Sequence, residues 1–156
     1  MRPYEGDGLY EMHRETALLA YQHIFPPGLY PFPDDAERKT WHDLVAGHER
    51  SHQLLVADTG GEMVGAVVAK PGTLQRLFVL PGHCGTGVAG RLLAAAMDVS
   101  CKARAQPCQL EVLEANWRAR QFYERHGWVR DHRSRAADHA PYPVVVGYTL
   151  HPAAPW

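Results

Sequence analysis

The sequence is poor in cysteine, and its cysteines follow no ligand or disulfide pattern. Cys84, Cys101 and Cys108 are odd in number and lack C-x-x-C spacing. Disulfide-stapled small domains and zinc ribbons both need denser, more regular cysteines. The ten histidines are scattered, and no pair has the H-E-x-x-H spacing of a helical zinc site. We therefore expect neither a disulfide framework nor a metal site.

Long apolar runs and a strong net charge are also missing. Charged residues are spread through the first 19 positions, so no secretion-signal core fits there. No apolar run approaches the roughly 20 residues of a membrane-spanning helix. The formal net charge is −1, without the basic footprint of a nucleic-acid-binding protein. We expect a cytoplasmic protein that binds neither membranes nor nucleic acid.

The composition is that of an ordinary globular domain. The 156 residues are 46% hydrophobic and 21% charged, with no linker and no internal repeat. Residues 1–90 hold 7 Lys and Arg against 11 Asp and Glu, whereas residues 91–156 hold 9 against 6. This asymmetry suits a site between a cationic and an anionic ligand, although chance clustering explains it equally well.

Apolar periodicity and turn residues predict a single α+β domain. Helices are expected at 9–24, 34–46, 88–104 and 116–126, and strands at 53–58, 63–70, 73–79, 109–113, 128–134 and 144–150. Asp34 is the expected N-cap of the second helix. The last strand is apolar enough either to pair across a homodimer or to lie buried, and residues 151–156 form a tail.

A proline-rich segment separates the first two helices. Four prolines in residues 25–33 remove backbone donors and fix φ, so the helix cannot continue. The aromatic side chains of this stiff loop, Phe25, Tyr30 and Phe32, either line a substrate pocket or pack between helices. Aromatic rings near an acidic N-terminal half would suit a cationic substrate.

A glycine-rich turn follows the third strand. The run Gly85-Thr86-Gly87-Val88-Ala89-Gly90 opens a helix. Glycines allow successive backbone N–H groups to point into one concavity, and the helix N-terminus adds partial positive charge. The turn therefore predicts a binding site for a phosphate or diphosphate.

The same turn spells G-x-G-x-x-G, the fingerprint of dinucleotide-binding oxidoreductases, and Glu111 follows at a suitable distance. Two features disfavour that interpretation. Residues 80–84 separate the strand from the first glycine, and the residues after the next strand are too few to complete a doubly wound sheet. A Walker-type loop is excluded because no Gly-Lys-Ser/Thr is present.

Two blocks resemble the GNAT superfamily of acyl-CoA-dependent N-acetyltransferases. The first is Leu77-Phe78-Val79-x-Pro81 followed by Gly85-x-Gly87-Val88-Ala89-x-x-Leu92-Leu93; the second is Val112-Leu113-Glu114-Ala115-Asn116-x-x-Ala119-x-x-Phe122-Tyr123-Glu124-x-x-Gly127-Trp128. The resemblance covers residues 53–150. It implies one domain over residues 1–156, with a mixed, strongly curved central sheet flanked by about four helices. Residues 1–50 would form the substrate side, 53–134 the acyl-CoA-binding core and 144–150 the last strand.

The resemblance also implies roles for individual residues. The reaction would move an acetyl group from acetyl-CoA to a primary amine of a small molecule or peptide, by direct attack on the thioester. Asn116 would bind the pantetheine arm, main-chain groups of residues 78–80 the thioester, and Tyr123 would be the general acid. A tyrosine pKa near 10 keeps the hydroxyl protonated at neutral pH, so it holds a proton that it can donate as charge develops on the departing sulfur. The implied co-substrate-binding residues are Leu77, Phe78, Val79, Cys84, Gly85, Thr86, Gly87, Val88, Ala89, Gly90, Asn116, Ala119 and Tyr123.

The sequence departs from the family pattern at two places. Cys84 stands where the family usually has Arg or Gln, which predicts weaker CoA binding; the thiol is either an inert loop group or an acyl acceptor. Gln75 and Arg76 stand where many members carry an acidic general base. Glu111 is the first substitute, with Glu114, His13 and His23 behind it, and direct loss of the amine proton to water is the remaining route. These departures keep a second hypothesis open, an acyl-CoA-binding sensor without turnover.

Overall fold

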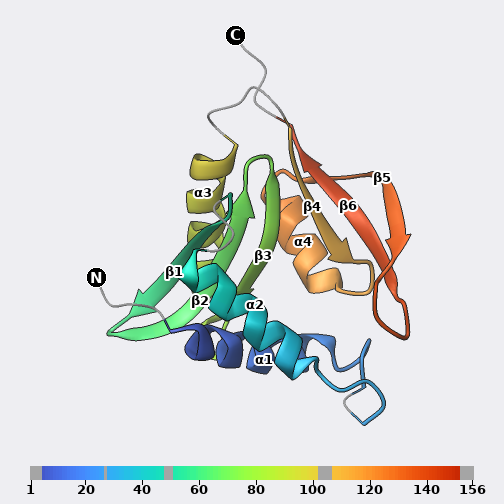
Figure 1. The fold of residues 1–156 in the computed structure, drawn as a ribbon. Helices are drawn as coiled ribbons and strands as arrows, with labels where there is room; N and C mark the ends of the chain where they lie inside the picture. The colour runs from blue at the N-terminus through green and yellow to red at the C-terminus, as the bar shows by residue number, and fades with distance from the viewer. Residues whose placement is uncertain (1–4, 27, 48–50, 102–106, 152–156) are drawn as a thin grey trace.

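The computed structural model describes residues 5–26, 28–47, 51–101 and 107–151. The element order, shown in Figure 1, is α1 (Gly6–Tyr21), α2 (Asp34–Ala46), β1 (Gln53–Thr59), β2 (Glu62–Lys70), β3 (Thr73–Val79), a short 3-10 turn (Pro81–His83), α3 (Val88–Ser100), β4 (Cys108–Leu113), α4 (Trp117–Arg125), β5 (Val129–Ala136) and β6 (Val144–Leu150).

The six strands form one sheet in the order β1-β2-β3-β4-β6-β5. The pairs β1–β2, β2–β3, β4–β6 and β5–β6 are antiparallel, and only β3 and β4 are parallel. This order confirms the predicted mixed sheet with four helices. It also excludes the doubly wound parallel sheet that a dinucleotide-binding fold requires.

β3 and β4 touch only at one end. Their sole registered pair is Thr73 with Gln109 at the start of both strands. Figure 1 shows the two strands separating from that point toward their C-terminal ends. Because parallel strands that diverge leave main-chain groups without ladder partners, this part of the sheet has free backbone donors and acceptors.

The apolar run of β2 is buried on both faces of the sheet. Val64 and Val67 pack in a core with Leu92 of α3 and Tyr123 of α4. Ala66, Val68 and Phe78 pack on the other face against Leu9 of α1 and Trp41 of α2. A continuous apolar strand is the pattern of a strand covered on both sides, as seen here.

Some boundaries differ from the sequence-based expectation. α1 runs from Gly6 to Tyr21, earlier than predicted. The last predicted residues of α3, up to Arg104, lie partly outside the described residues. The predicted cap is wrong, because α2 starts at Asp34 itself and Pro33 is its N-cap. The Asp34 carboxylate instead accepts hydrogen bonds from Arg14 Nε at 2.8 Å and from the Tyr10 hydroxyl.

The expectation that the cysteines form no disulfide is wrong. Cys101, just after α3, and Cys108, the first residue of β4, form a disulfide with their Cα atoms 6.0 Å apart. Spacing along the sequence did not reveal this pair, because the fold and not a C-x-x-C motif brings the end of α3 beside the start of β4. Cys84 is a free, exposed thiol.

The last strand lies inside the sheet. β6 pairs with β4 on one side and β5 on the other, so burial explains its apolar sequence and it offers no edge to a second chain. Every helix in the described part of the chain is too short or too polar to cross a membrane.

Candidate functional site

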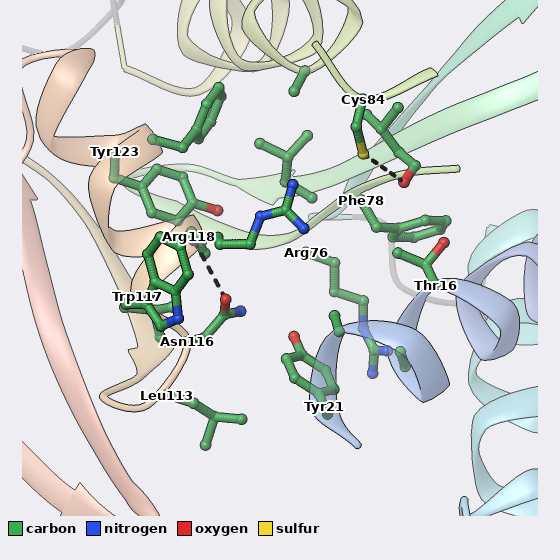
Figure 2. A pocket seen from close by; sticks show the side chains of 18 of the residues that line it. Thr16, Tyr21, Arg76, Phe78, Cys84, Leu113, Asn116, Trp117, Arg118 and Tyr123 are labelled. Carbon is green, nitrogen blue, oxygen red and sulfur yellow. Dashed lines mark hydrogen bonds between the residues drawn. The ribbon is translucent and has the colours of Figure 1, made fainter. Parts of the chain in front are cut away.

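The divergence of β3 and β4 opens a pocket of about 1000 Å³. Its walls come from α1, the second half of β3, the glycine turn and first turn of α3, the end of β4, and α4. Figure 2 shows side chains from these elements converging on one space. Segments far apart in the sequence, including both blocks of the motif, therefore face the same volume.

The end of β3 presents a main-chain N–H to this pocket. The N–H of Leu80 donates to Val64 O at 2.8 Å, which commits that donor to β2. Hydrogen-bonding direction alternates along an antiparallel pair, so the N–H and C=O of Val79 point the opposite way, toward β4. No residue of β4 pairs with Val79. The N–H of Val79, rather than that of Leu80, is the donor available at the divergence.

The glycine turn supplies a second group of donors. Gly85 and Gly87 have φ of 78° and 86°, in the left-handed region that side chains disfavour. The amides of Cys84 and Thr86 are bonded within the turn, at 3.3 and 3.4 Å. Within the described residues, those of Gly85, Gly87, Val88 and Ala89 donate to no backbone acceptor. Together with the α3 N-terminus, they form a concave donor surface suited to an anion.

α4 carries Tyr123 into the pocket. The Asn116 side chain caps this helix by accepting from the Ala119 N–H at 3.3 Å. The Tyr123 ring packs against Phe122 and Trp128 and is only 9% exposed. Burial, with a contribution from Tyr21, raises the pKa of Tyr123 well above its ordinary value. The hydroxyl is therefore protonated at physiological pH, and Figure 2 shows it pointing into the pocket.

His13 of α1 lies in an aromatic cluster on the pocket wall. Its ring contacts those of Phe32, Trp41 and Phe78. Burial, reinforced by Arg76 and opposed by Glu37, lowers the pKa of His13 from 6.5 to about 4. The Trp41 indole N–H donates to His13 Nδ1 at 3.2 Å. A neutral His13 with Nδ1 as acceptor carries its proton on Nε2, so it is poorly prepared to accept another proton.

The carboxylates proposed as general base are both in ion pairs. Glu111 of β4 lines the pocket, and its Oε2 accepts from Arg135 at 2.7 and 3.0 Å. Glu114 does not line the pocket and pairs with Arg130 at 2.8 Å. His23 lines it, with Nε2 3.2 Å from the carbonyl oxygen of Ala115. Of the two carboxylates, Glu111 is the one that lines the pocket.

Most residues predicted for the site line this pocket. They are Leu77, Phe78, Val79, Cys84, Gly85, Gly87, Ala89, Gly90, Glu111, Asn116, Ala119 and Tyr123. Val88 is buried in the core, and the Thr86 hydroxyl donates to the carbonyl of His83. Phe25, Tyr30 and Phe32 lie outside the lining; Phe32 packs in the core beneath His13.

Sequence reasoning missed two prominent lining residues, Tyr21 and Arg118. Both follow from helical periodicity. Tyr21 lies four residues after Ala17 on α1, and Arg118 lies four residues before Phe122 on α4, so each shares a face with a lining residue. Burial raises the pKa of Tyr21. In the described part of the chain, no group of three His, Cys, Asp or Glu side chains is arranged to hold a metal ion.

Residues 28–142 match the family model of the GNAT acetyltransferase domain. The chain belongs to the GNAT family. A curated relative from Archaeoglobus fulgidus, described as an uncharacterized N-acetyltransferase, is 32% identical over 81 residues. The matched region covers 45% of this chain and 55% of that relative, so this chain spans about half the length of the relative.

Solved structures of GNAT proteins share the fold. PaiA N-acetyltransferase from Thermoplasma acidophilum, in complex with coenzyme A, aligns with a TM-score of 0.69 at 17% identity over 94% of this chain and 95% of its own. A GCN5-related N-acetyltransferase from Rhodopseudomonas palustris gives 0.72 at 15% identity, over 97% and 94%. A chimera of spermidine N-acetyltransferase from Vibrio cholerae gives 0.64 at 19% identity, over 96% and 93%. These likenesses support the fold, and the GNAT family supports acetyl transfer from acetyl-CoA in general terms.

Proposed function

We propose that this protein transfers an acetyl group from acetyl-CoA to a primary amine of a small molecule or peptide, by direct attack of the amine on the thioester. One observation carries the proposal. Gly85, Gly87 and Ala89, whose amides donate to no backbone acceptor in the described residues, line one pocket with Val79 and with Tyr123, at the divergence of β3 and β4.

Acetyl-CoA brings a diphosphate and a reactive thioester. Gly85, Gly87, Val88 and Ala89 would hold the diphosphate through their main-chain N–H groups, which need no side-chain charge. This explains how the site tolerates Cys84 where the family usually has Arg or Gln. The Asn116 side chain would serve the pantetheine arm with the lone pairs and N–H groups that capping leaves free.

Val79 is the oxyanion donor in this proposal. When the amine attacks, negative charge develops on the thioester oxygen, and a fixed backbone N–H stabilises that charge at little reorganisation cost. Such a donor typically contributes about 3 kcal/mol to the barrier reduction. The Leu80 amide does not compete for this role, because it bonds to β2.

Tyr123 donates the proton that the leaving thiolate needs. Its raised pKa keeps the hydroxyl protonated until the carbon–sulfur bond breaks. The hydroxyl donates to the sulfur as negative charge develops there, and collapse of the tetrahedral intermediate drives the transfer, because a tyrosine is a weaker acid than a thiol. The attacking amine loses its own proton to water or to Glu111, whose second carboxylate oxygen is not used by Arg135.

A second function is favoured by one observation. Within the described residues, the one carboxylate on the pocket wall, Glu111, is ion-paired with Arg135. A site without a strong base suits an acyl-CoA-binding sensor that does not turn over.

A thiol-release assay separates the two functions. The protein is incubated with acetyl-CoA and each member of a broad amine panel, and free CoA thiol is measured against a no-amine blank. Acceptor-dependent thiol release, with the acetylated amine found by mass spectrometry, supports the enzyme. Tight acetyl-CoA binding without release for any amine would support the sensor instead.

A further inference from the structure

His126 follows the last residue of α4 and lines the pocket. Phe122, one turn earlier, holds its imidazole in two ways. The carbonyl oxygen of Phe122 lies 2.8 Å from His126 Nδ1, and the two rings pack with their centroids 4.4 Å apart. The side chain is exposed, yet these contacts set the orientation of its ring and so the direction of Nε2, the nitrogen that Phe122 leaves free.

Nε2 of His126 lies against the first turn of α3. A Cβ on Gly90 would lie 3.3 Å from this nitrogen, so the absence of a side chain there makes room for the imidazole. Gly90 is the third residue of α3 and lines the pocket with Gly87 and Ala89. The N–H groups of a first helical turn have no acceptor within the helix, and they suit an anion. His126 therefore borders the proposed diphosphate site, on the side of α4.

The bond to Phe122 determines what Nε2 can do. A carbonyl oxygen only accepts hydrogen bonds, so Nδ1 carries a hydrogen. In the neutral ring, Nε2 is then an acceptor, and its lone pair opposes a phosphate oxygen. In the protonated ring, Nε2 carries a hydrogen and a share of the positive charge, and it donates to such an oxygen. Only the imidazolium form of His126 suits an anionic ligand.

We infer that His126 is a further ligand of the acetyl-CoA diphosphate and makes its binding depend on pH. The ring takes a proton from solvent as the diphosphate binds, and Nε2 donates to a phosphate oxygen. α4 thereby supplies the side-chain cation that Cys84 does not supply from the glycine turn. The inference rests on the diphosphate site of the proposed function and deepens it.

The described surroundings of His126 provide no carboxylate that would hold the ring protonated before a ligand binds. The titratable or charged lining residues of the glycine turn and α4 are His83, Cys84, Arg118 and Arg125, and α3 adds none to the described lining. Glu111, the one carboxylate in that lining, pairs with Arg135. Glu124 of α4 accepts from the Tyr148 hydroxyl at 2.7 Å and is not part of the lining. Because nearby cations disfavour an imidazolium and a diphosphate favours it, the proton arrives with the ligand.

Calorimetric titration with dephospho-CoA tests the inference. This probe keeps the diphosphate and the pantetheine arm and lacks the 3′-phosphate, a group that itself titrates at about pH 6. We expect the Kd to increase about tenfold from pH 6 to pH 8, the effect of losing one charge-assisted hydrogen bond. At pH 7, titrations in two buffers of different ionisation enthalpy should show net proton uptake on binding.

Three variants assign the effect. H126Q stays uncharged at both pH values, so its Kd should remain near the wild-type value at pH 8, and its proton uptake should be lost. H126K keeps a positive charge at both pH values and should bind with similar affinity at pH 6 and 8, which a merely structural role would not produce. H132Q makes the same change as H126Q at an exposed histidine of β5 outside the pocket and should retain the wild-type pH dependence.

These outcomes are separate from those of the thiol-release assay. An equal Kd at pH 6 and 8 in the wild type, or a pH dependence that persists in H126Q, overturns the inference even when amines are acetylated. If dephospho-CoA binds with the expected pH dependence and no amine is acetylated, the inference stands and the proposed acetyl transfer fails. Failure of dephospho-CoA to bind at either pH overturns both.

Discussion

At the scale of single residues, the environment of each ionisable group determines the role that it can have. Tyr123 and His13 both line the pocket, and burial changes both pKa values in the direction that keeps the side chain neutral. For Tyr123 the neutral form holds the proton that the proposed mechanism gives to the leaving sulfur. For His13 it places an uncharged ring among aromatic neighbours.

Y123F is expected to lower kcat by about a hundredfold or more, the usual contribution of a general acid. The Kd for acetyl-CoA should change little, because the ring and its packing are retained. Steady-state kinetics and titration of acetyl-CoA measure the two effects separately. Y142F is the matched control, since Tyr142 is 61% exposed and outside the pocket. Unchanged kcat in Y123F would remove the assigned role.

His13 makes stability depend on pH. Its pKa is about 4 in the folded protein against 6.5 for an unperturbed histidine, so the unfolded chain binds the extra proton first. The stability contribution is present above pH 6.5 and is lost as the pH falls toward 4. Between pH 7 and 5 the free energy of unfolding should fall by about 2 kcal/mol from this residue.

Urea denaturation at the two pH values checks the His13 prediction. H13N should show a smaller pH dependence than the wild type, whatever its absolute stability. H132N, which removes an exposed histidine of β5, should leave the pH dependence as it is in the wild type. Equal pH dependence in H13N and the wild type would contradict a buried, neutral His13.

At the scale of elements, the turn between β3 and α3 needs glycine for its backbone conformation and also lines the pocket. Gly87 caps α3 with φ of 86°, and Gly47 follows α2 with φ of 75°. A Cβ at either position meets nothing within 4 Å, so in both cases the need for glycine comes from the backbone conformation. Only Gly87 lies on the pocket wall.

G87A and G47A should therefore lower the free energy of unfolding by similar amounts and differ in their affinity for acetyl-CoA. Each should lose roughly 1–2 kcal/mol of unfolding free energy, the cost of a side chain in the left-handed region. G87A should also weaken acetyl-CoA binding about tenfold, because its relaxed backbone turns one amide away from the diphosphate. Calorimetric titration of both variants with acetyl-CoA measures this difference. Equal Kd values for G87A and G47A would argue against the amide site.

At the scale of the whole molecule, the pocket lies where two halves of the sheet meet. β1, β2, β3 and α3 form one side, and β4, β5, β6 and α4 form the other. A ligand seated between β3 and β4 contacts both sides and binds only the folded state. It should therefore raise the stability of the entire fold.

Acetyl-CoA at a hundredfold excess over its Kd should add about 2.7 kcal/mol to the free energy of unfolding. For a chain of this length this raises Tm by roughly 5–10 °C. NAD at the same concentration should give no comparable shift, since the sheet lacks a dinucleotide-binding order. A larger shift with NAD would contradict the acyl-CoA site.

Local patterns in the sequence determined the elements and the two blocks of the site. Period-2 and period-3.6 patterns placed the strands and helices, and the glycine turn with its following helix predicted an anion site, because these features depend on neighbours within a few residues. The disulfide between Cys101 and Cys108, the α2 cap and the pairing of Glu111 with Arg135 escaped prediction. Each depends on which segments the fold brings together.

The sequence by itself determined the GNAT family and the two blocks that carry the candidate site, since Tyr123 and the glycine turn are recognisable in their local setting. The tertiary structure alone decided the geometry and charge of the pocket. In the folded chain β3 diverges from β4, the Leu80 amide bonds to β2 and that of Val79 does not. Among the described residues, Arg76 and Arg135 of the pocket have carboxylate partners, whereas Arg118 and Arg125 have none. Coulomb and hydrogen-bond energies depend on distances in space, and only the folded chain sets those distances.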